Sequence, residues 1–167
     1  LSAYSSTASA TTADTISPPA PASLTATAAS GSQITLSWTA ATDNVGVTGY
    51  RVERCQGVGC SSFSQVAAPT GTTHSDPGLQ PATSYSYRVR ATDAAGNLST
   101  YSSTASATTL DTIPPETTIT GGPSGIITVN VASFRWTGSD NVTPVGSLLY
   151  AFRLDPLEPS FSAFDNA

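Results

Sequence analysis

The chain has 167 residues with six arginines, no lysine and eleven acidic residues, which gives a formal net charge of −5. This weakly acidic balance excludes the basic surface that binding to nucleic acid or to anionic lipid requires. No apolar run approaches the ~20 residues that cross a bilayer, and the well-patterned aromatic residues argue against disorder. We therefore expect folded domains with no nucleic-acid partner and no membrane insertion.

One segment of the sequence occurs twice. Leu1 to Ile16 returns 97 residues later as Leu98 to Ile113, with fourteen of the sixteen positions identical. Such a repeat indicates an array of modules of about that length. We assign residues 1–15 to the C-terminal strand of a preceding module, 16–109 to a complete module and 110–167 to an incomplete one.

The complete module is predicted to contain only β-strands. It follows a stiff, proline-rich segment, Asp14 to Pro21, which cannot donate to a strand ladder. Seven short segments then alternate apolar and polar residues with the period of a strand. We expect these strands at 23–28, 33–39, 50–54, 61–66, 71–75, 83–91 and 99–109. With no segment of helical period, the fold class is all-β, about seven strands per module in a two-sheet sandwich.

The residues from Pro18 to Thr109 resemble the fibronectin type III family. Trp38 stands at the end of the second strand, where the family has a core tryptophan. The segment Leu79-Gln-Pro-Ala-Thr-Ser-Tyr85 is similar to the family's Leu-x-Pro-x-Thr-x-Tyr corner. The resemblance implies a core containing Trp38 and Tyr85, and a hydrogen bond between the Tyr85 hydroxyl and the backbone.

The same resemblance implies a function. Bacterial members of the family occur in secreted multidomain proteins, so we expect a non-catalytic spacer, stalk or surface-fibre module at an extracellular or cell-surface location. Its expected partners are the neighbouring modules of the same chain.

The last segment resembles the opening half of a related bacterial immunoglobulin-like repeat. Trp136-Thr-Gly-Ser-Asp-Asn-Val142 is similar to the segment that begins at Trp38. The alternation places Ala132, Phe134 and Trp136 on a buried face, with Trp136 in the core. Because no closing strands follow, we expect the natural chain to continue beyond Ala167; strands from another chain are the alternative.

Cys55 and Cys60 are expected to form a disulfide. They flank Gln-Gly-Val-Gly, whose glycines allow a tight return of the chain. Free thiols and a two-cysteine metal site are the alternatives, but zinc prefers four ligands and the chain has one histidine.

The acidic residues stand mostly in turns, where aspartate caps backbone N–H groups. A second interpretation is calcium bound at a module junction, with oxygen ligands from loops that cluster at one end of a sandwich. The residues considered for capping are Asp14, Asp43, Asp76, Asp93, Asp111 and Asp140, and those considered for calcium are Asp43, Asn44, Asp93, Asn97 and Asp111. Capping is the preferred role, so we predict no cofactor and no metal-binding residue.

No catalytic residue is assigned. The only histidine, His74, has Ser75 and Asp76 beside it, but adjacent residues of a strand point to opposite faces and do not form a relay. Two other non-catalytic roles stay open. One is an accessory module of a secreted enzyme that adheres to polysaccharide or another surface, which exposed coplanar aromatic rings would favour. Only Phe63, Tyr101 and Phe161 lack an assigned core position. The other is a subunit of an extracellular filament built from copies of the chain.

Overall fold

The computed structural model describes residues 3–122 and 133–151. The chain divides into two compact units, Leu1–Leu110 and Asp111–Ala167, and each is described by itself. Among the described residues, no helix has the length and apolar character needed to cross a membrane.

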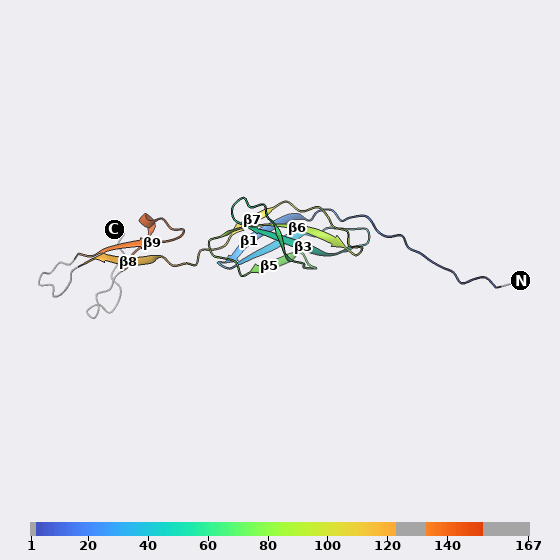
Figure 1. Cartoon of the computed structure of the whole chain (residues 1–167), viewed down its shortest axis with the longest axis horizontal. Coiled ribbons are helices and arrows are strands. Elements are labelled where there is room, and N and C mark those ends of the chain that lie inside the picture. The colour runs from blue at the N-terminus through green and yellow to red at the C-terminus, as the bar shows by residue number, and fades with distance from the viewer. Residues whose placement is uncertain (1–2, 123–132, 152–167) are drawn as a thin grey trace. The chain divides into compact units, whose positions relative to one another are not determined.

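The first unit contains seven antiparallel strands in two sheets (Figure 1). One sheet has the order β1-β2-β5 and consists of β1 (Ala22–Ser30), β2 (Gln33–Thr39) and β5 (Thr73–Pro77). The other has the order β4-β3-β6-β7 and consists of β3 (Val47–Gln56), β4 (Ser64–Ala67), β6 (Ser84–Asp93) and β7 (Ala105–Thr108). The predicted all-β sandwich is confirmed.

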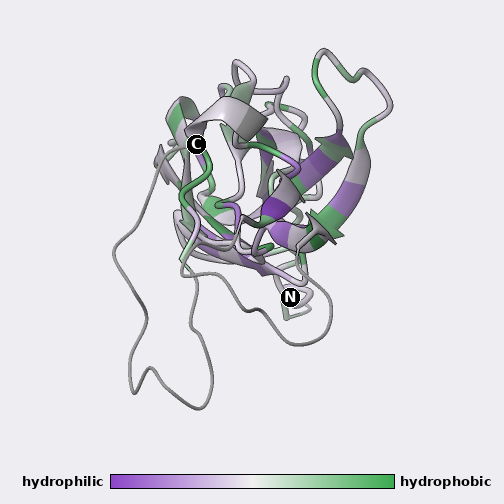
Figure 2. Ribbon diagram, turned by 90° about the vertical axis from the view of Figure 1, so that its left-hand side faces the viewer, coloured by the Kyte–Doolittle hydropathy of each residue, from purple (hydrophilic) through white to green (hydrophobic). Residues whose placement is uncertain are grey.

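The core lies between these two sheets. β2 and the second half of β6 bury every second side chain because successive side chains point to opposite faces, and the ribbons in Figure 2 carry bands of hydrophilic and hydrophobic residues. In β2, Ile34 and Leu36 are fully buried, and in β6, Val89 and Ala91 are fully buried. Strands with one apolar face therefore account for the two-layer arrangement.

Two aromatic residues occupy the core positions that the sequence assigns to them. Trp38 is 6% exposed and packs edge-on against Tyr50, with ring centroids 5.4 Å apart. Tyr85 is 2% exposed, and its hydroxyl accepts a 3.0 Å hydrogen bond from the N–H of Gln80. The backbone bond expected of the tyrosine corner is therefore present.

The last predicted strand, 99–109, is wrong in its first half. Within residues 99–109, only β7 forms a regular ladder with β6. Upstream of β7, serine hydroxyls accept hydrogen bonds from β6: Ala91 N–H donates to Ser99 Oγ (2.8 Å) and Val89 N–H donates to Ser102 Oγ (3.0 Å). Because these side chains take over β6 donors, the backbone does not need the regular pairing of a strand.

The chain enters and leaves the first unit at opposite ends of β6. Beyond the C-terminal end of β6, Asn97 Nδ2 donates hydrogen bonds to the carbonyl groups of Asp14 (3.2 Å) and Ile16 (3.3 Å). Before its N-terminal end, Ala82 N–H donates to the carbonyl of Leu110 (3.3 Å). At about 3.3 Å per residue, β6 separates these two ends by about 30 Å.

Residues 3–21 contain no strand, although Ala8–Thr11 repeats the sequence of β7. In the described residues β7 already pairs with the edge of β6, so the copy of its sequence at Ala8–Thr11 has no second β6 with which to pair. The assignment of 1–15 to a preceding module stays a prediction.

The described part of the second unit contains one antiparallel strand pair, β8 (Glu116–Gly121) with β9 (Arg135–Ser139), and a 3-10 turn, η1 (Val145–Ser147). Trp136 is half-buried, and its ring lies 5.9 Å from that of Tyr150. Phe134 is 37% exposed, so its predicted burial is wrong: no facing sheet covers β8 and β9 within residues 111–122 and 133–151. Ala132 lies outside the described residues, and the incomplete immunoglobulin-like module stays a prediction.

Candidate functional site

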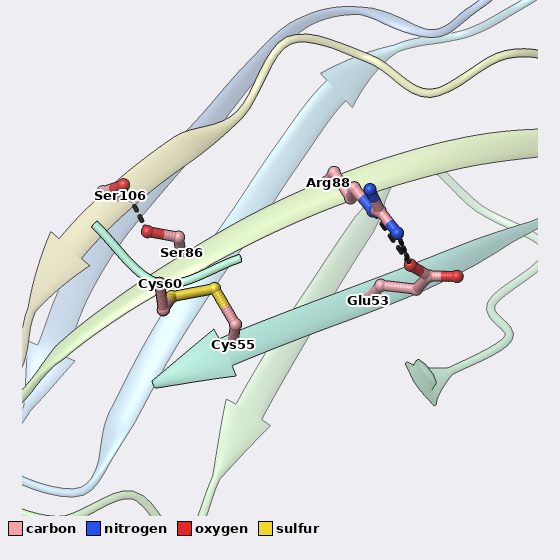
Figure 3. The surroundings of a disulfide bond; sticks show 6 residues. All are labelled: Glu53, Cys55, Cys60, Ser86, Arg88 and Ser106. Atoms are coloured by element: carbon pink, nitrogen blue, oxygen red, sulfur yellow. Dashed lines mark hydrogen bonds and ion pairs between the residues drawn. A yellow bond between two sulfur atoms is a disulfide. The ribbon is translucent and has the colours of Figure 1, made fainter. Parts of the chain in front are cut away.

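A disulfide closes the loop that follows β3. Cys55 and Cys60 are bonded, with their Cα atoms 5.9 Å apart, as the sequence predicts (Figure 3). Gly57 and Gly59 adopt positive φ angles of 104° and 68°, which glycine reaches without steric cost. Val58 lies at the tip and is 93% exposed. The bond therefore acts as a local staple of a protruding turn.

The outer face of the β3–β6 pair carries an aromatic–arginine cluster, defined as Glu53, Phe63, Arg88, Arg90 and Tyr101. Arg88 and Glu53 point toward one another from neighbouring strands in Figure 3, and the shortest distance between their nitrogen and oxygen atoms is 2.7 Å. The Arg88 guanidinium also lies 4.4 Å from the ring centroid of Phe63 and 3.8 Å from that of Tyr101. Two aromatic rings without an assigned core position are thus occupied by cation–π contacts.

Glu53 is the electrostatic centre of this cluster. Its side chain is 10% exposed, and the Tyr101 hydroxyl donates a 2.6 Å hydrogen bond to Oε1. Burial acts to raise the pKa of Glu53, but the hydrogen bonds from Tyr101 and Arg88 outweigh it and hold the pKa below 4.5. The same bond raises the pKa of Tyr101. Both Glu53 oxygens accept hydrogen bonds, whereas Arg90 Nε is buried without one. The rings stack on a guanidinium, in contrast to the exposed aromatic platform that polysaccharide adhesion would favour.

Three carboxylates from distant parts of the first unit meet at one end of the sandwich. Asp14 begins the proline-rich linker, Asp43 lies in the β2–β3 loop and Asp93 ends β6. Ligand oxygens of the three residues all lie within 4.8 Å of one another. We call these three residues the acidic cluster.

Hydrogen bonds hold each member of the acidic cluster in place. Asp14 Oδ1 accepts from Ile16 N–H (3.1 Å) and Asn44 Nδ2 (3.1 Å). Asp93 accepts from the backbone N–H and the side-chain Nδ2 of Asn97, both at 2.8 Å. Asp93 is 3% exposed; burial acts to raise its pKa, but the bonds from Asn97 hold that pKa below 3.8. Asp93 is therefore charged at neutral pH.

One oxygen of each of two cluster members has no partner. Asp43 Oδ2 accepts from Val45 N–H (2.9 Å), but Asp43 Oδ1 is buried without a hydrogen bond. Asp14 Oδ2 is likewise buried without a hydrogen bond. Buried polar atoms in native proteins nearly always have a partner, so these two oxygens require an explanation.

The second unit repeats part of this arrangement. Asn141 Nδ2 donates to Asp111 Oδ1 (3.3 Å), as Asn44 does to Asp14. Val142 N–H and Thr143 N–H donate to Asp140 Oδ2, as Val45 and Gly46 do to Asp43. The bond from Thr143 N–H holds the pKa of Asp140 below its usual range. Within the described residues, no third carboxylate joins Asp111 and Asp140.

The structure corrects one member of the expected calcium set. Asp43, Asn44, Asp93 and Asn97 come together as expected, but Asp14 is the third carboxylate and Asp111 is bonded to Asn141 of the second unit. The 97-residue repeat carries the missing signal, because it aligns Asp14 with Asp111 and places each before the module that follows it.

The other acidic and catalytic predictions have mixed outcomes. Turn capping is confirmed for Asp14, Asp43, Asp93, Asp111 and Asp140. It is wrong for Asp76, which is buried in β5 and pairs with Arg54 at 2.9 Å. His74 lies half-buried in β5, and its neighbour Ser75 is exposed. The structure therefore does not assemble the His74–Ser75–Asp76 sequence into a relay.

Comparisons with known proteins match this architecture. A family model described as the fibronectin type III domain covers residues 18–108. The chain is 48% identical over 96 residues to chitinase A1 from Niallia circulans, a match that covers 58% of this chain and 13% of the chitinase. It is 37% identical over 151 residues to endoglucanase B from Cellulomonas fimi, which covers 88% of this chain and 14% of the endoglucanase. Among solved structures, domains A168–A170 from titin superpose with a TM-score of 0.51 and 26% identity, over 57% of this chain and 33% of that chain. The chain thus spans a small part of these relatives.

Proposed function

The chain belongs to the fibronectin type III family, and from that premise we propose that its complete module is a non-catalytic spacer in a larger bacterial protein, secreted or held at the cell surface. The chitinase and the endoglucanase support this proposal, because the chain matches only a short stretch of each. The disulfide supports an oxidising, extracellular compartment.

The points at which the chain enters and leaves the module are the main support for the proposal. The linker at Asp14 joins one end of β6 and Leu110 leaves from the other, so anything attached to the two ends is held about 30 Å apart by a folded strand. A sandwich with this connectivity works as a rigid rod between its neighbours. Proline-rich joints such as Ser17-Pro18-Pro19 resist bending and preserve that separation.

The two alternative roles have weaker support. Adhesion to polysaccharide would use exposed aromatic rings, but Phe63 and Tyr101 both stack on Arg88; Phe161 lies outside the described residues. Assembly into a filament would use an open strand edge, for which residues 133–151 offer β9. We retain both as outcomes of the test.

Small-angle scattering tests the spacer. One and then two further copies of residues 14–110 are inserted between Leu110 and Asp111, and the maximum dimension of each protein is measured. We expect a linear increase of about 30 Å per copy, at a mass that stays monomeric. A matched series in which Ser-Pro-Pro at 17–19 is replaced by Ser-Gly-Ser should grow less steeply, because glycine-rich joints behave as flexible coils.

Three results would contradict the proposal. The first is a maximum dimension that does not grow with copy number. The second is a mass that rises with concentration, which would indicate a filament subunit. The third is retention on insoluble chitin or cellulose, which would indicate a binding module.

A further inference from the structure

We propose that Asp14, Asp43 and Asp93 form a calcium site that fastens the linker to the module that follows it. The proposal goes beyond the spacer role, because it makes the stiffness of the joint depend on a ligand. Three segments that are separate in sequence would share one ion.

The spacing of the three carboxylates fits a single calcium shell. Calcium binds oxygen at 2.3–2.6 Å, so two ligands on opposite sides of the ion lie about 4.6–5.2 Å apart. The ligand oxygens of Asp14, Asp43 and Asp93 all lie within 4.8 Å of one another. One ion can therefore contact all three residues without a change of fold.

The two orphaned oxygens point independently to a cation. Asp14 Oδ2 and Asp43 Oδ1 are buried and accept no hydrogen bond, while the other oxygen of each residue is engaged by N–H donors. Carboxylate oxygens can only accept, and a buried charge without a partner is strongly destabilising. The ion pairs formed by the described residues leave these two atoms out, since they join Arg54 to Asp76, and Arg88 and Arg90 to Glu53.

The donor set selects calcium among common metal ions. The acidic cluster supplies oxygen ligands and lacks the histidine and cysteine that zinc prefers. Magnesium requires near-ideal octahedral geometry at 2.0–2.1 Å, whereas calcium accepts six to eight oxygens in flexible geometry. Three protein residues leave room for water in the remaining positions. A site of this kind suits the weak range of about 10⁻⁴–10⁻³ M that extracellular modules use.

The structural consequence concerns the linker. Asp14 is the cluster member on the linker, and it is already tied to the module through Asn44 and Asn97. Adding an ion to the three carboxylates would replace mutual repulsion by attraction at this joint. Calcium should therefore order residues 14–17 against the sandwich.

The test is calcium titration of the full chain after chelator treatment, followed by calorimetry and thermal unfolding. We expect one ion per chain. At tenfold excess over the dissociation constant, the folding equilibrium constant should rise about elevenfold. Magnesium at the same concentration should give a smaller increase.

Three variants sharpen the test. Asp14→Asn and Asp43→Asn should each weaken calcium binding at least tenfold. The effect of Asp43→Asn on stability should also change sign with calcium. In chelator the variant should be at least as stable as the wild type, because repulsion between carboxylates is relieved, and in calcium it should be less stable. Asp111→Asn is the matched control, since Asp111 has the same local sequence and turn as Asp14 outside the acidic cluster, and it should bind as the wild type does.

Either of two outcomes would overturn the proposal. One is no calcium-dependent change up to 10 mM, about ten times the weak end of the expected range. The other is binding that survives in Asp14→Asn or is lost in Asp111→Asn. The sign reversal of Asp43→Asn separates an ion site from a purely structural loop, and its absence would count equally against the site. Since none of these results depends on molecular length, the calcium site and the spacer can fail separately.

Discussion

Tyr87 of β6 donates a 2.8 Å hydrogen bond to Oδ2 of Asp76 in β5, so a buried polar bond joins the two sheets of the first unit. Arg54 of β3 completes the group, with Nη1 2.9 Å and 3.1 Å from the two Asp76 oxygens. Tyr87 is fully buried; its burial and this bond raise the pKa of the phenol. The core is therefore held together by charge as well as by apolar contact.

Removing the Tyr87 hydroxyl should destabilise the module without opening a cavity. Tyr87→Phe keeps the ring and loses a hydrogen bond to a charged group, which costs about 1.5–3 kcal/mol of unfolding free energy. Urea denaturation measures the change. Tyr4→Phe, at a fully exposed ring, serves as the control and should leave the midpoint unchanged. A Tyr87→Phe loss as small as that of the control would show that the inter-sheet bond contributes little.

Glu53 of the aromatic–arginine cluster should make the free energy of unfolding depend on pH in the acid range. Because the pKa of Glu53 is lower in the folded chain than its ordinary value of 4.5, its contribution is fully present above pH 4.5 and is lost as the pH falls through the folded pKa. Glu53→Gln should flatten this part of the curve of unfolding free energy against pH. Glu116→Gln, at an exposed residue of β8, should retain the slope, and equal slopes in both variants would contradict the assignment.

Loss of the disulfide should have a small and local effect. The loop between Cys55 and Cys60 is short. Closing it lowers the entropy of the unfolded chain and so stabilises the fold by about 2 kcal/mol. We expect Cys55→Ser/Cys60→Ser to lose about that much while the fold is retained, as judged by circular dichroism. A reducing agent should shift the wild type to the stability of this double variant and leave the variant unchanged. A global loss of structure in the variant would show that the loop contributes to the core.

The tyrosine corner should stabilise the β5–β6 connection. Tyr85→Phe removes the acceptor of the Gln80 N–H, which costs about 1 kcal/mol because the ring itself stays buried. Hydrogen exchange should be faster at Gln80 in the variant than in the wild type. Unchanged exchange at this amide would mean that water replaces the hydroxyl without loss.

Periodicity in the sequence was sufficient for the sandwich and for most of its strands. It predicted β2 with the bounds found in the structure, because alternation of Ile34, Leu36 and Trp38 is not interrupted. It overextended the last strand, because the serines at 99 and 102 are compatible with a strand. Their side chains bond to β6, which is a tertiary contact that local patterning does not contain.

The acidic cluster was only partly predictable for a similar reason. Loops at one end of a sandwich are expected to lie close together, and on that basis the sequence predicts that Asp43 and Asp93 are neighbours. Asp14 lies 29 residues before Asp43 in a segment without regular structure, and its position depends on hydrogen bonds from Asn44 and Asn97. Stacking of Phe63 and Tyr101 on Arg88 is equally a product of register between β3 and β6 and of the loops beside them.

The hydrogen bonds from Asn97 to the linker indicate that the linker and the module form one repeating unit. Residues 14–110 comprise 97 positions, which equals the period of the repeat. A gene duplication of that length would copy the module together with the linker before it. Each copy would then contain both Asn97 and the linker carbonyl groups to which Asn97 donates. A copied unit of 97 residues that keeps these hydrogen bonds therefore starts at Asp14, four residues before the region that the family model matches.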